Sequence, residues 1–209
     1  MDFKDEIKQL GERVPKLKEL AKTEEATKNA FIMPFIRALG YDVFNPMEVV
    51  PEFIADKGIK KGEKVDYAIF KDGKATILIE CKHWEQNLNV HDGQILRYFQ
   101  VLPEVKFAIL TNGIEYRFYS DLVNQNIMDE KPFLEFRIAD IRENQIEELK
   151  KFHKSYFDIE SIVNTASDLK YTNELKALLH QEFTNPSADF VKHFAKQVYP
   201  SNVSSKVLD

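Results

Sequence analysis

The sequence has 209 residues, 44% of them hydrophobic and 30% charged, which suits one large domain, or a domain with a helical appendage, built around an apolar core. No apolar run approaches the length that crosses a bilayer, and the charged N-terminus lacks the apolar stretch of a secretory signal, so we expect a cytoplasmic protein with no membrane partner. The formal net charge of -5 argues against a protein that coats nucleic acid over a wide surface, because that function requires a basic surface. Contact with DNA would therefore depend on a local patch, on a bound cation or on regions missing from this chain.

Two helical segments are predicted ahead of residue 41. Apolar residues in the first 20 positions recur at steps of three and four, and a kink or interruption is expected at Pro15. A second helix is expected to begin near Thr23 and to end at Gly40, because glycine commonly terminates helices. Pro34 lies inside this second segment and argues against an unbroken helix.

The pattern then changes to that of strands. Lys71-Asp72-Gly73-Lys74 is typical of a tight hairpin turn, so the segments on its two sides are expected to pair. Strands are expected over residues 48–54, 64–71, 75–82, 105–110, 114–119 and 134–138, with a helix over residues 90–102 and further helices from residue 143. We therefore predict an α/β domain with a mixed sheet over residues 1–142 and a helical C-terminal extension over residues 143–209.

Charged residues occupy unusual positions in the central hairpin. Asp66 interrupts one predicted strand, and Glu80 directly follows the apolar run of the other. Because strand side chains alternate, Glu80 and Lys82 are expected on the same face. Charges at the end of a core strand are costly unless they are paired or bind a metal. Two neighbouring carboxylates favour Mg²⁺, which activates water, and a lysine beside them can position that water or stabilise the transition state.

Each of these residues also has an ordinary interpretation. An aspartate at the start of a strand is usually a turn or surface residue, and Glu80 with Lys82 is compatible with a solvated ion pair of little energetic value. Their joint placement across one hairpin favours a functional site. The single cysteine, Cys81, excludes a disulfide and a cysteine-rich zinc site. Strand alternation places its side chain opposite Glu80 and Lys82, where we expect it to be buried.

Several motifs follow the order found in PD-(D/E)XK nucleases. Residues 62–67 (GEKVDY), then a strand pair and residues 79–82 (IECK), resemble the core of that superfamily. Gln94 and Tyr98 match the Q-x-x-x-Y signature of one of its branches, and residues 23–28 (TEEATK) resemble the first helix of the N-terminal nuclease domain of type I restriction enzyme R subunits. The resemblance implies a restriction-endonuclease-like fold, in which a mixed β-sheet is flanked by helices.

The resemblance also implies a role for each matching residue. The catalytic residues implied are Asp66, Glu80, Lys82 and Gln94. The residues that would bind Mg²⁺, with Mn²⁺ as an alternative, are Asp66, Glu80, Glu24 and the backbone carbonyl of Cys81. Gln94 and Tyr98 would support the site and the DNA backbone, although without the resemblance a polar surface glutamine and a core-edge tyrosine are as well expected. By their positions beside the site, Lys64, Lys61 and His83 are further candidates for contact with nucleic acid, although a solvated loop is the ordinary interpretation of the two lysines and packing that of the histidine.

The acidic residue of the first helix has two candidates. The spacing to Thr27 and Lys28 favours Glu24, but helical geometry does not separate it from Glu25. An acid in the first turn of a helix also complements the helix dipole without any further role.

These observations predict a Mg²⁺-dependent DNA endonuclease related to restriction systems, which hydrolyses phosphodiester bonds by in-line attack of a metal-activated water. The expected partners are DNA and either other restriction-system subunits or a second copy of the chain, because cutting both strands requires two sites. One alternative is a catalytically silent nuclease-like module that binds nucleic acid or protein in a larger restriction complex, which the acidic charge and the absence of a Walker A motif favour. Another is a part of a longer protein that acts only with other subunits.

Overall fold

The computed structural model describes residues 2–55, 63–88 and 93–199, and of residues 93 and 94 it describes the backbone alone. The chain divides into two compact units, Met1–Ser167 and Asp168–Asp209, and the division falls inside one long helix, α6 (Ile159–Thr184). The first unit includes α5 (Glu143–Lys150), which buries two apolar side chains. It therefore extends past residue 142, where the sequence analysis placed the end of the first domain.

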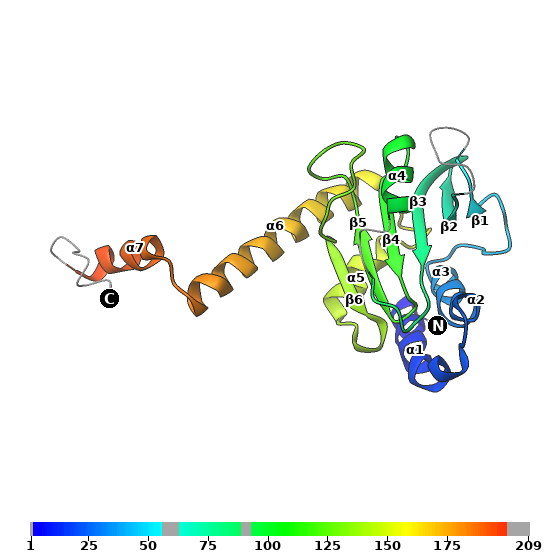
Figure 1. Ribbon diagram of the computed structural model, residues 1–209, viewed down its shortest axis with the longest axis horizontal. Coiled ribbons are helices and arrows are strands. Elements are labelled where there is room, and N and C mark those ends of the chain that lie inside the picture. Colours follow the sequence, from blue (N-terminus) through cyan, green and yellow to red (C-terminus); the bar gives the residue numbers. More distant parts are fainter. Residues whose placement is uncertain (1, 56–62, 89–92, 200–209) are drawn as a thin grey trace. The chain divides into compact units, whose positions relative to one another are not determined.

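A six-stranded mixed sheet forms the centre of the first unit in the described part of the chain (Figure 1). Its strands lie side by side in chain order: β1 (Val49–Phe53), β2 (Val65–Lys71), β3 (Lys74–Cys81), β4 (Phe107–Thr111), β5 (Glu115–Tyr119) and β6 (Leu134–Arg137). Neighbours are antiparallel except β3 and β4, which are parallel and separated in the chain by α4 (Gly93–Val101). This arrangement confirms the predicted α/β class with a mixed sheet.

The β2–β3 hairpin forms where the sequence predicts it. The central Asp-Gly of its turn has φ values of 51° and 75°, and positive φ at both central positions is the mark of a type I′ turn, whose twist matches that of paired strands. Tyr67 pairs with Ile79 across the hairpin. Asp66 and Glu80, the two carboxylates that the sequence singled out, are the next residues beyond this pair.

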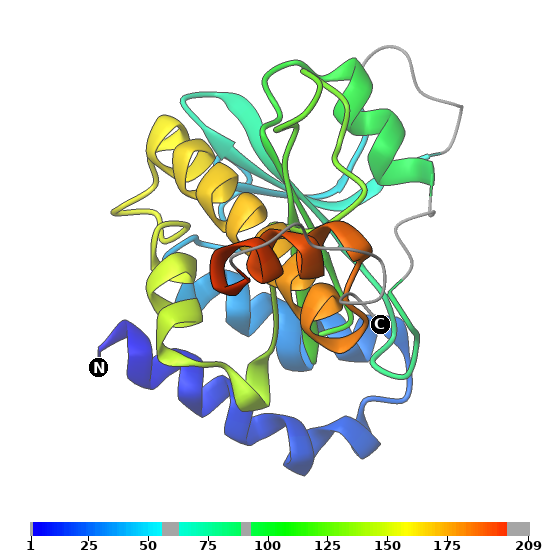
Figure 2. The same cartoon turned by 90° about the vertical axis from the view of Figure 1, so that its left-hand side faces the viewer.

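Helices cover both faces of the sheet. On one face, Ala108 and Leu110 of β4 belong to a buried apolar cluster with Phe99 of α4. On the other face, the ring of Phe35 lies 4.1 Å, between centroids, from that of Tyr116 on β5. Figures 1 and 2 both show α4 toward one end of the sheet and the N-terminal helices toward the other.

The N-terminal helices are more continuous than the sequence predicted. Helix α1 (Phe3–Leu17) runs through Pro15 and changes to a 3-10 turn, η1 (Lys18–Leu20), only beyond it. Thr23 then caps α2 (Glu24–Thr27), because its side-chain oxygen accepts a hydrogen bond of 3.0 Å from the Ala26 amide. The predicted start of this second helix is therefore confirmed.

Pro34 does not break the second helix. A π turn, η2 (Lys28–Ile32), connects α2 directly to α3 (Met33–Ala38). Proline lacks the amide hydrogen that an α-helix needs and its ring crowds the carbonyl four residues earlier, and the wider π turn absorbs both effects. The helical segment ends before Gly40, whose φ of 82° confirms the predicted terminator.

The C-terminal helices are α6 and α7 (Ala188–Val198), which confirms the predicted helical extension. Ser187 caps α7 by accepting a hydrogen bond of 3.2 Å from the Phe190 amide. The large apolar side chains that these helices expose are Tyr171, Leu175, Leu178, Leu179, Phe183, Phe194 and Val198. Within the described ranges, no helix combines the length and the apolar character that crossing a membrane requires.

We expect Gly11→Ala to destabilise the fold. Gly11 lies where α1 crosses the 3-10 turn η3 (Ile138–Asp140), and a Cβ there would lie 2.5 Å from the backbone oxygen of Ile138. Alanine in a helix interior is normally about 0.5–1 kcal/mol better than glycine, but a backbone atom cannot move aside as a side chain does. The free energy of unfolding should fall by about 1–3 kcal/mol in urea denaturation.

The matched control is Glu12→Ala, at the next and exposed position of the same helix. It should change the unfolding free energy by less than about 0.5 kcal/mol. A Gly11→Ala variant that is more stable than the wild type would contradict the close approach of α1 to η3.

Candidate active site

Asp66 is held by both the sheet and a helix. Its Oδ2 accepts a hydrogen bond of 2.7 Å from the backbone amide of Cys81 on the neighbouring strand. Its Oδ1 accepts a hydrogen bond from the ammonium of Lys28, which comes from the π turn. The Lys28 and Asp66 side chains are only 14% and 17% exposed. Both carboxylate oxygens of Asp66 are therefore engaged, one by the backbone and one by a cation.

Lys28 is close to three carboxylates. Besides Asp66, its ammonium lies 3.5 Å from Glu24 Oε1 and 3.9 Å from Glu25 Oε2. Burial acts to lower the pKa of Lys28, but the hydrogen bond and the charge of Asp66 outweigh it and raise that pKa above its usual value. The side chain of Glu24 is 43% exposed and that of Glu25 is 70% exposed. Glu24 is thus the nearer and less exposed of the two candidates that the sequence left open.

A second ion pair lies at the end of β3. The ammonium of Lys82 donates a hydrogen bond of 3.0 Å to Glu80 Oε1, which agrees with the prediction that the two side chains share a face. The side chain of Glu80 is only 8% exposed and that of Lys82 is 23% exposed. The Lys82 amide donates to the Thr111 carbonyl at 2.9 Å, so the ladder with β4 continues past the last residue of β3 and fixes the backbone that carries Lys82.

Cys81 contributes its backbone and not its thiol. Its side chain is fully buried, as the strand alternation predicted. Burial raises the pKa of the thiol well above its usual value, and the charge of Asp66 acts in the same direction. A neutral, inaccessible thiol is neither a nucleophile nor a metal ligand. Its amide, which donates to Asp66, is the part of this residue that organises the site.

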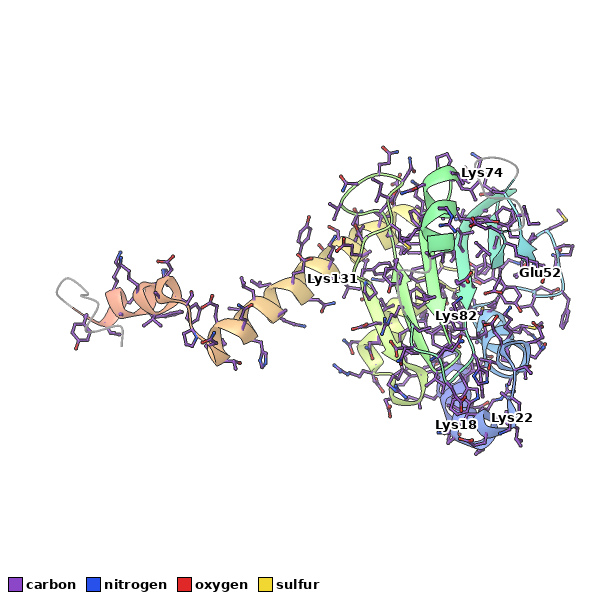
Figure 3. All side chains as sticks on the ribbon, in the orientation of Figure 1. Lys18, Lys22, Glu52, Lys74, Lys82 and Lys131 are labelled. Atoms are coloured by element: carbon purple, nitrogen blue, oxygen red, sulfur yellow. The ribbon has the colours of Figure 1, made fainter. Side chains whose placement is uncertain are left out.

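The segment after β3 is tied to the start of the second helix. His83 Nε2 lies 3.0 Å from the carbonyl oxygen of Ala21, and Trp84 Nε1 donates to the same oxygen at 2.9 Å. The ammonium of Lys18 lies 5.6 Å from the centroid of the Trp84 ring. In Figure 3, Lys18 and Lys22 lie beyond Lys82 on the side of the first unit that α1 occupies. His83 is thus partly buried and packs against the residues ahead of α2, and its expected contact with nucleic acid stays a prediction.

Tyr98 lies in the core and not on the surface. Its ring is fully buried, and its hydroxyl is 2.8 Å from the carbonyl oxygen of Glu63 and 3.1 Å from that of Phe53. The hydroxyl joins α4 to β1 and to the residues ahead of β2, a contact of the supporting kind, while the expected contact between Tyr98 and nucleic acid stays a prediction. The side chain of Gln94, the other residue of the Q-x-x-x-Y motif, lies outside the described part of the chain.

The two lysines expected near DNA have different outcomes. Lys64 forms an ion pair with Glu52 and is half exposed, so part of its charge is already compensated. Lys61 lies outside the described residues.

Arg97, which the sequence analysis did not select, donates a hydrogen bond of 3.0 Å from Nε to Glu63. This contact fixes the same stretch ahead of β2 that the Tyr98 hydroxyl holds.

Carboxylates suited to Mg²⁺ are present, but the predicted metal ligands are not assembled as one cluster. In the parts of the chain that the structure describes, no three or more His, Cys, Asp and Glu side chains are placed to hold a metal ion. Mg²⁺ commonly uses one or two carboxylates and takes its other ligands from water and phosphate. Asp66 and Glu80 are two such carboxylates by residue type and by strand register. They suit the ion when Lys28 and Lys82, which now pair with them, share or release their oxygens.

Lys28 is the main residue that the sequence analysis missed. Its spacing of four residues from Glu24 is a local signal for a helical ion pair. Its contact with Asp66, 38 residues away, depends on how α2 packs against the sheet. No local pattern in the sequence encodes that packing.

The comparisons with known proteins concern the central part of the chain. Residues 57–127 match the family described as type I restriction enzyme R protein N terminus, which confirms the predicted resemblance. The matched residues include β2 to β5 and hence Asp66, Glu80 and Lys82, whereas α1 to α3 lie outside them. No curated protein and no solved structure matched the chain.

Replacing Tyr98 by phenylalanine separates its two suggested roles. If the hydroxyl supports the residues ahead of β2, Tyr98→Phe should lower the free energy of unfolding by about 0.5–1.5 kcal/mol and leave the affinity for DNA unchanged. Denaturation and DNA-binding titrations measure the two effects. Tyr171→Phe, at an exposed position of α6, is the control for loss of a tyrosine hydroxyl. Full stability with weaker DNA binding would place the Tyr98 hydroxyl at the nucleic-acid surface instead.

Proposed function

We propose, from the match of residues 57–127 to the N terminus of type I restriction enzyme R proteins, that this chain is a Mg²⁺-dependent DNA endonuclease that hydrolyses phosphodiester bonds. The observation that carries the proposal is the hairpin register, in which Asp66 and Glu80 are the next residues beyond the pair Tyr67 and Ile79. The Lys82 ammonium lies 3.0 Å from Glu80 Oε1 at the end of β3.

Folding stability alone gives little reason for these charges. Replacing a buried ion pair by well-packed apolar side chains is often neutral or stabilising, and the Glu80 side chain is almost fully buried at the end of an apolar strand. Places where a sequence departs from folding rules are commonly functional sites. The free-energy cost of placing Glu80 and Lys82 at the end of an apolar strand is therefore better explained by chemistry that needs a carboxylate and an ammonium together.

Each residue has a distinct task in the proposed reaction. Mg²⁺ bound by Asp66 and Glu80 would supply a Lewis acid and an activated water. Asp66 is oriented for this by the Cys81 amide. Lys82 provides a positive charge next to Glu80 that orients the attacking water or stabilises the charge that develops on the phosphate. Glu24 is the candidate for a further acidic group, through its position beside Lys28.

The proposed substrate is DNA, held by a local surface and not by the whole protein. The net charge of -5 makes wide electrostatic binding unfavourable. Lys18 and Lys22, at the α1 side of the first unit, lie beyond Lys82 and away from Lys74 (Figure 3). Together with Lys61, Lys64 and His83 they are the candidates for phosphate contacts. Other restriction-system subunits or a second copy of the chain would supply the second cutting site.

A second candidate function is supported by the ion pairs themselves. Lys28 and Lys82 form ion pairs with Asp66 and Glu80, so each of the two proposed metal ligands already has one of the protein's own cations beside it. That arrangement also suits a catalytically silent module that binds nucleic acid or protein within a restriction complex. Such a module would bind DNA equally well with and without Mg²⁺ and would not cut it.

The decisive variant for cleavage is Lys82→Met, which keeps the length of the side chain and removes its charge. We expect its rate of plasmid cleavage with Mg²⁺ or Mn²⁺ to fall by about 100-fold or more, with the fold unchanged by circular dichroism. Lys74→Met is the matched control, because Lys74 begins the same strand at its far end and is exposed (Figure 3). Equal cleavage by Lys82→Met and the wild type would refute the assignment.

Asp66→Asn and Glu80→Gln complete this test. Each should abolish cleavage, because each removes one proposed metal ligand without changing side-chain size. A wild-type protein that binds DNA and fails to cut under every metal condition would favour the silent module.

A further inference from the structure

We propose that Lys28 is a built-in counter-cation of Asp66 that a divalent metal has to displace, so that Lys28 sets how tightly the site binds metal. The proposal rests on the proposed function in one respect, the assignment of Asp66 as a metal ligand. Lys28 lies outside the residues that match the restriction-enzyme family, so the inference concerns a part of this chain to which the match assigns nothing.

The first step is the occupancy of Asp66. Its Oδ2 is engaged by the Cys81 amide at 2.7 Å, and its Oδ1 is engaged by the Lys28 ammonium. The amide is part of the sheet and cannot leave without disturbing β2 and β3. The ammonium is at the end of a flexible four-carbon side chain. A metal ion that approaches Asp66 therefore competes with Lys28 and not with the backbone.

The second step is that the ammonium of Lys28 has other carboxylates within reach. Glu24 and Glu25 precede it by four and three residues in a continuous helical segment, the spacings at which helical side chains are neighbours. Their oxygens already lie 3.5 Å and 3.9 Å from the ammonium. A small rotation of the side chain moves the charge from Asp66 toward these two acids, which are more exposed and belong to its own helix.

The third step is the charge balance. One ammonium faces three carboxylates, so the group carries an excess of negative charge that attracts a dication. A dication bound at Asp66 would repel an ammonium in direct contact with the same carboxylate. With the ammonium beside Glu24 and Glu25, both cations have opposite charges next to them. In the proposed exchange, the metal ion thus takes the place of the Lys28 ammonium at Asp66 as the ammonium moves to Glu24 and Glu25.

A purely structural role for Lys28 gives the opposite expectation. If Lys28 only holds Asp66 in place, its removal would leave the carboxylate loosely positioned and weaken metal binding. If Lys28 competes with metal, its removal strengthens binding. The sign of the change in metal affinity therefore decides between the two roles.

The experiment measures Mn²⁺ binding to the full chain without DNA, by calorimetry and by quenching of Trp84, the single tryptophan. The backbone amide of Trp84 lies 3.4 Å from the Thr27 hydroxyl, next to Lys28 in the chain. Lys28→Met should bind Mn²⁺ about tenfold more tightly than the wild type, which corresponds to about 1.4 kcal/mol. Lys74→Met, which changes an exposed lysine at the far end of β3 (Figure 3), removes one charge without touching Asp66 and should change the affinity by less than about twofold.

Two further variants keep the test decisive. Lys28→Arg retains the positive charge and forms a stronger paired hydrogen bond to a carboxylate, so it should weaken Mn²⁺ binding. This result is available even if Lys28→Met unfolds. Asp66→Asn in the Lys28→Met background should abolish the added affinity, which locates the bound ion at Asp66.

Each outcome bears on the proposal. Tighter binding by Lys28→Met that depends on Asp66 supports it, also where the wild type binds no measurable Mn²⁺ or cuts no DNA. Equal or weaker binding by folded Lys28→Met, or no binding by any variant, overturns it. Where the wild type binds Mn²⁺ measurably, unchanged binding by Lys28→Arg overturns it as well. A wild type that cuts DNA while Lys28→Met binds metal no more tightly would refute the exchange and leave the endonuclease proposal standing.

Discussion

A slip of one residue between β2 and β3 would turn Glu80 and Lys82 to the opposite face of the sheet. At the site the register is that of Tyr67 with Ile79. It differs by one residue from the register at the Asp-Gly turn, because the ladder shifts between Ile69 and Phe70. The hairpin contacts of the site follow from the register of Tyr67 with Ile79. It places the Cys81 amide within hydrogen-bond distance of Asp66 and leaves the Cys81 thiol in the core.

The two ion pairs of the site depend on different levels of structure. Glu80 and Lys82 are two residues apart, so any extended strand brings them together. Lys28 and Asp66 meet only because α2 is docked against the end of the sheet. His83 and Trp84 secure that docking through the carbonyl of Ala21. Loosening the N-terminal helices would thus disturb Asp66 before it disturbed Glu80.

Short motifs in the sequence were sufficient to predict three features of the fold. These are the hairpin turn at Asp-Gly, the buried strand ahead of Glu80, and the end of the second helix at Gly40, each of which depends on only a few neighbouring residues. The Q-x-x-x-Y spacing placed Tyr98 near the site but could not show that its ring is buried and its hydroxyl bound to backbone carbonyls. The partner of Lys28 was hidden for the same reason, since a contact over 38 residues arises from packing. The proposed metal ligands remain a prediction from residue type and register.

The π turn at residues 28–32 determines how far the acidic first turn of the second helix is rotated relative to α3. A π turn holds one residue more than an α turn and is equivalent to a single-residue insertion in a helix. Each helical residue turns the chain by roughly 100°. Deleting one residue here would restore a regular helix and rotate the acidic first turn by that angle relative to α3. The deletion would improve the hydrogen bonding of the helix while carrying its charged side chains away from Asp66, so local regularity and the geometry of the site oppose each other at this turn.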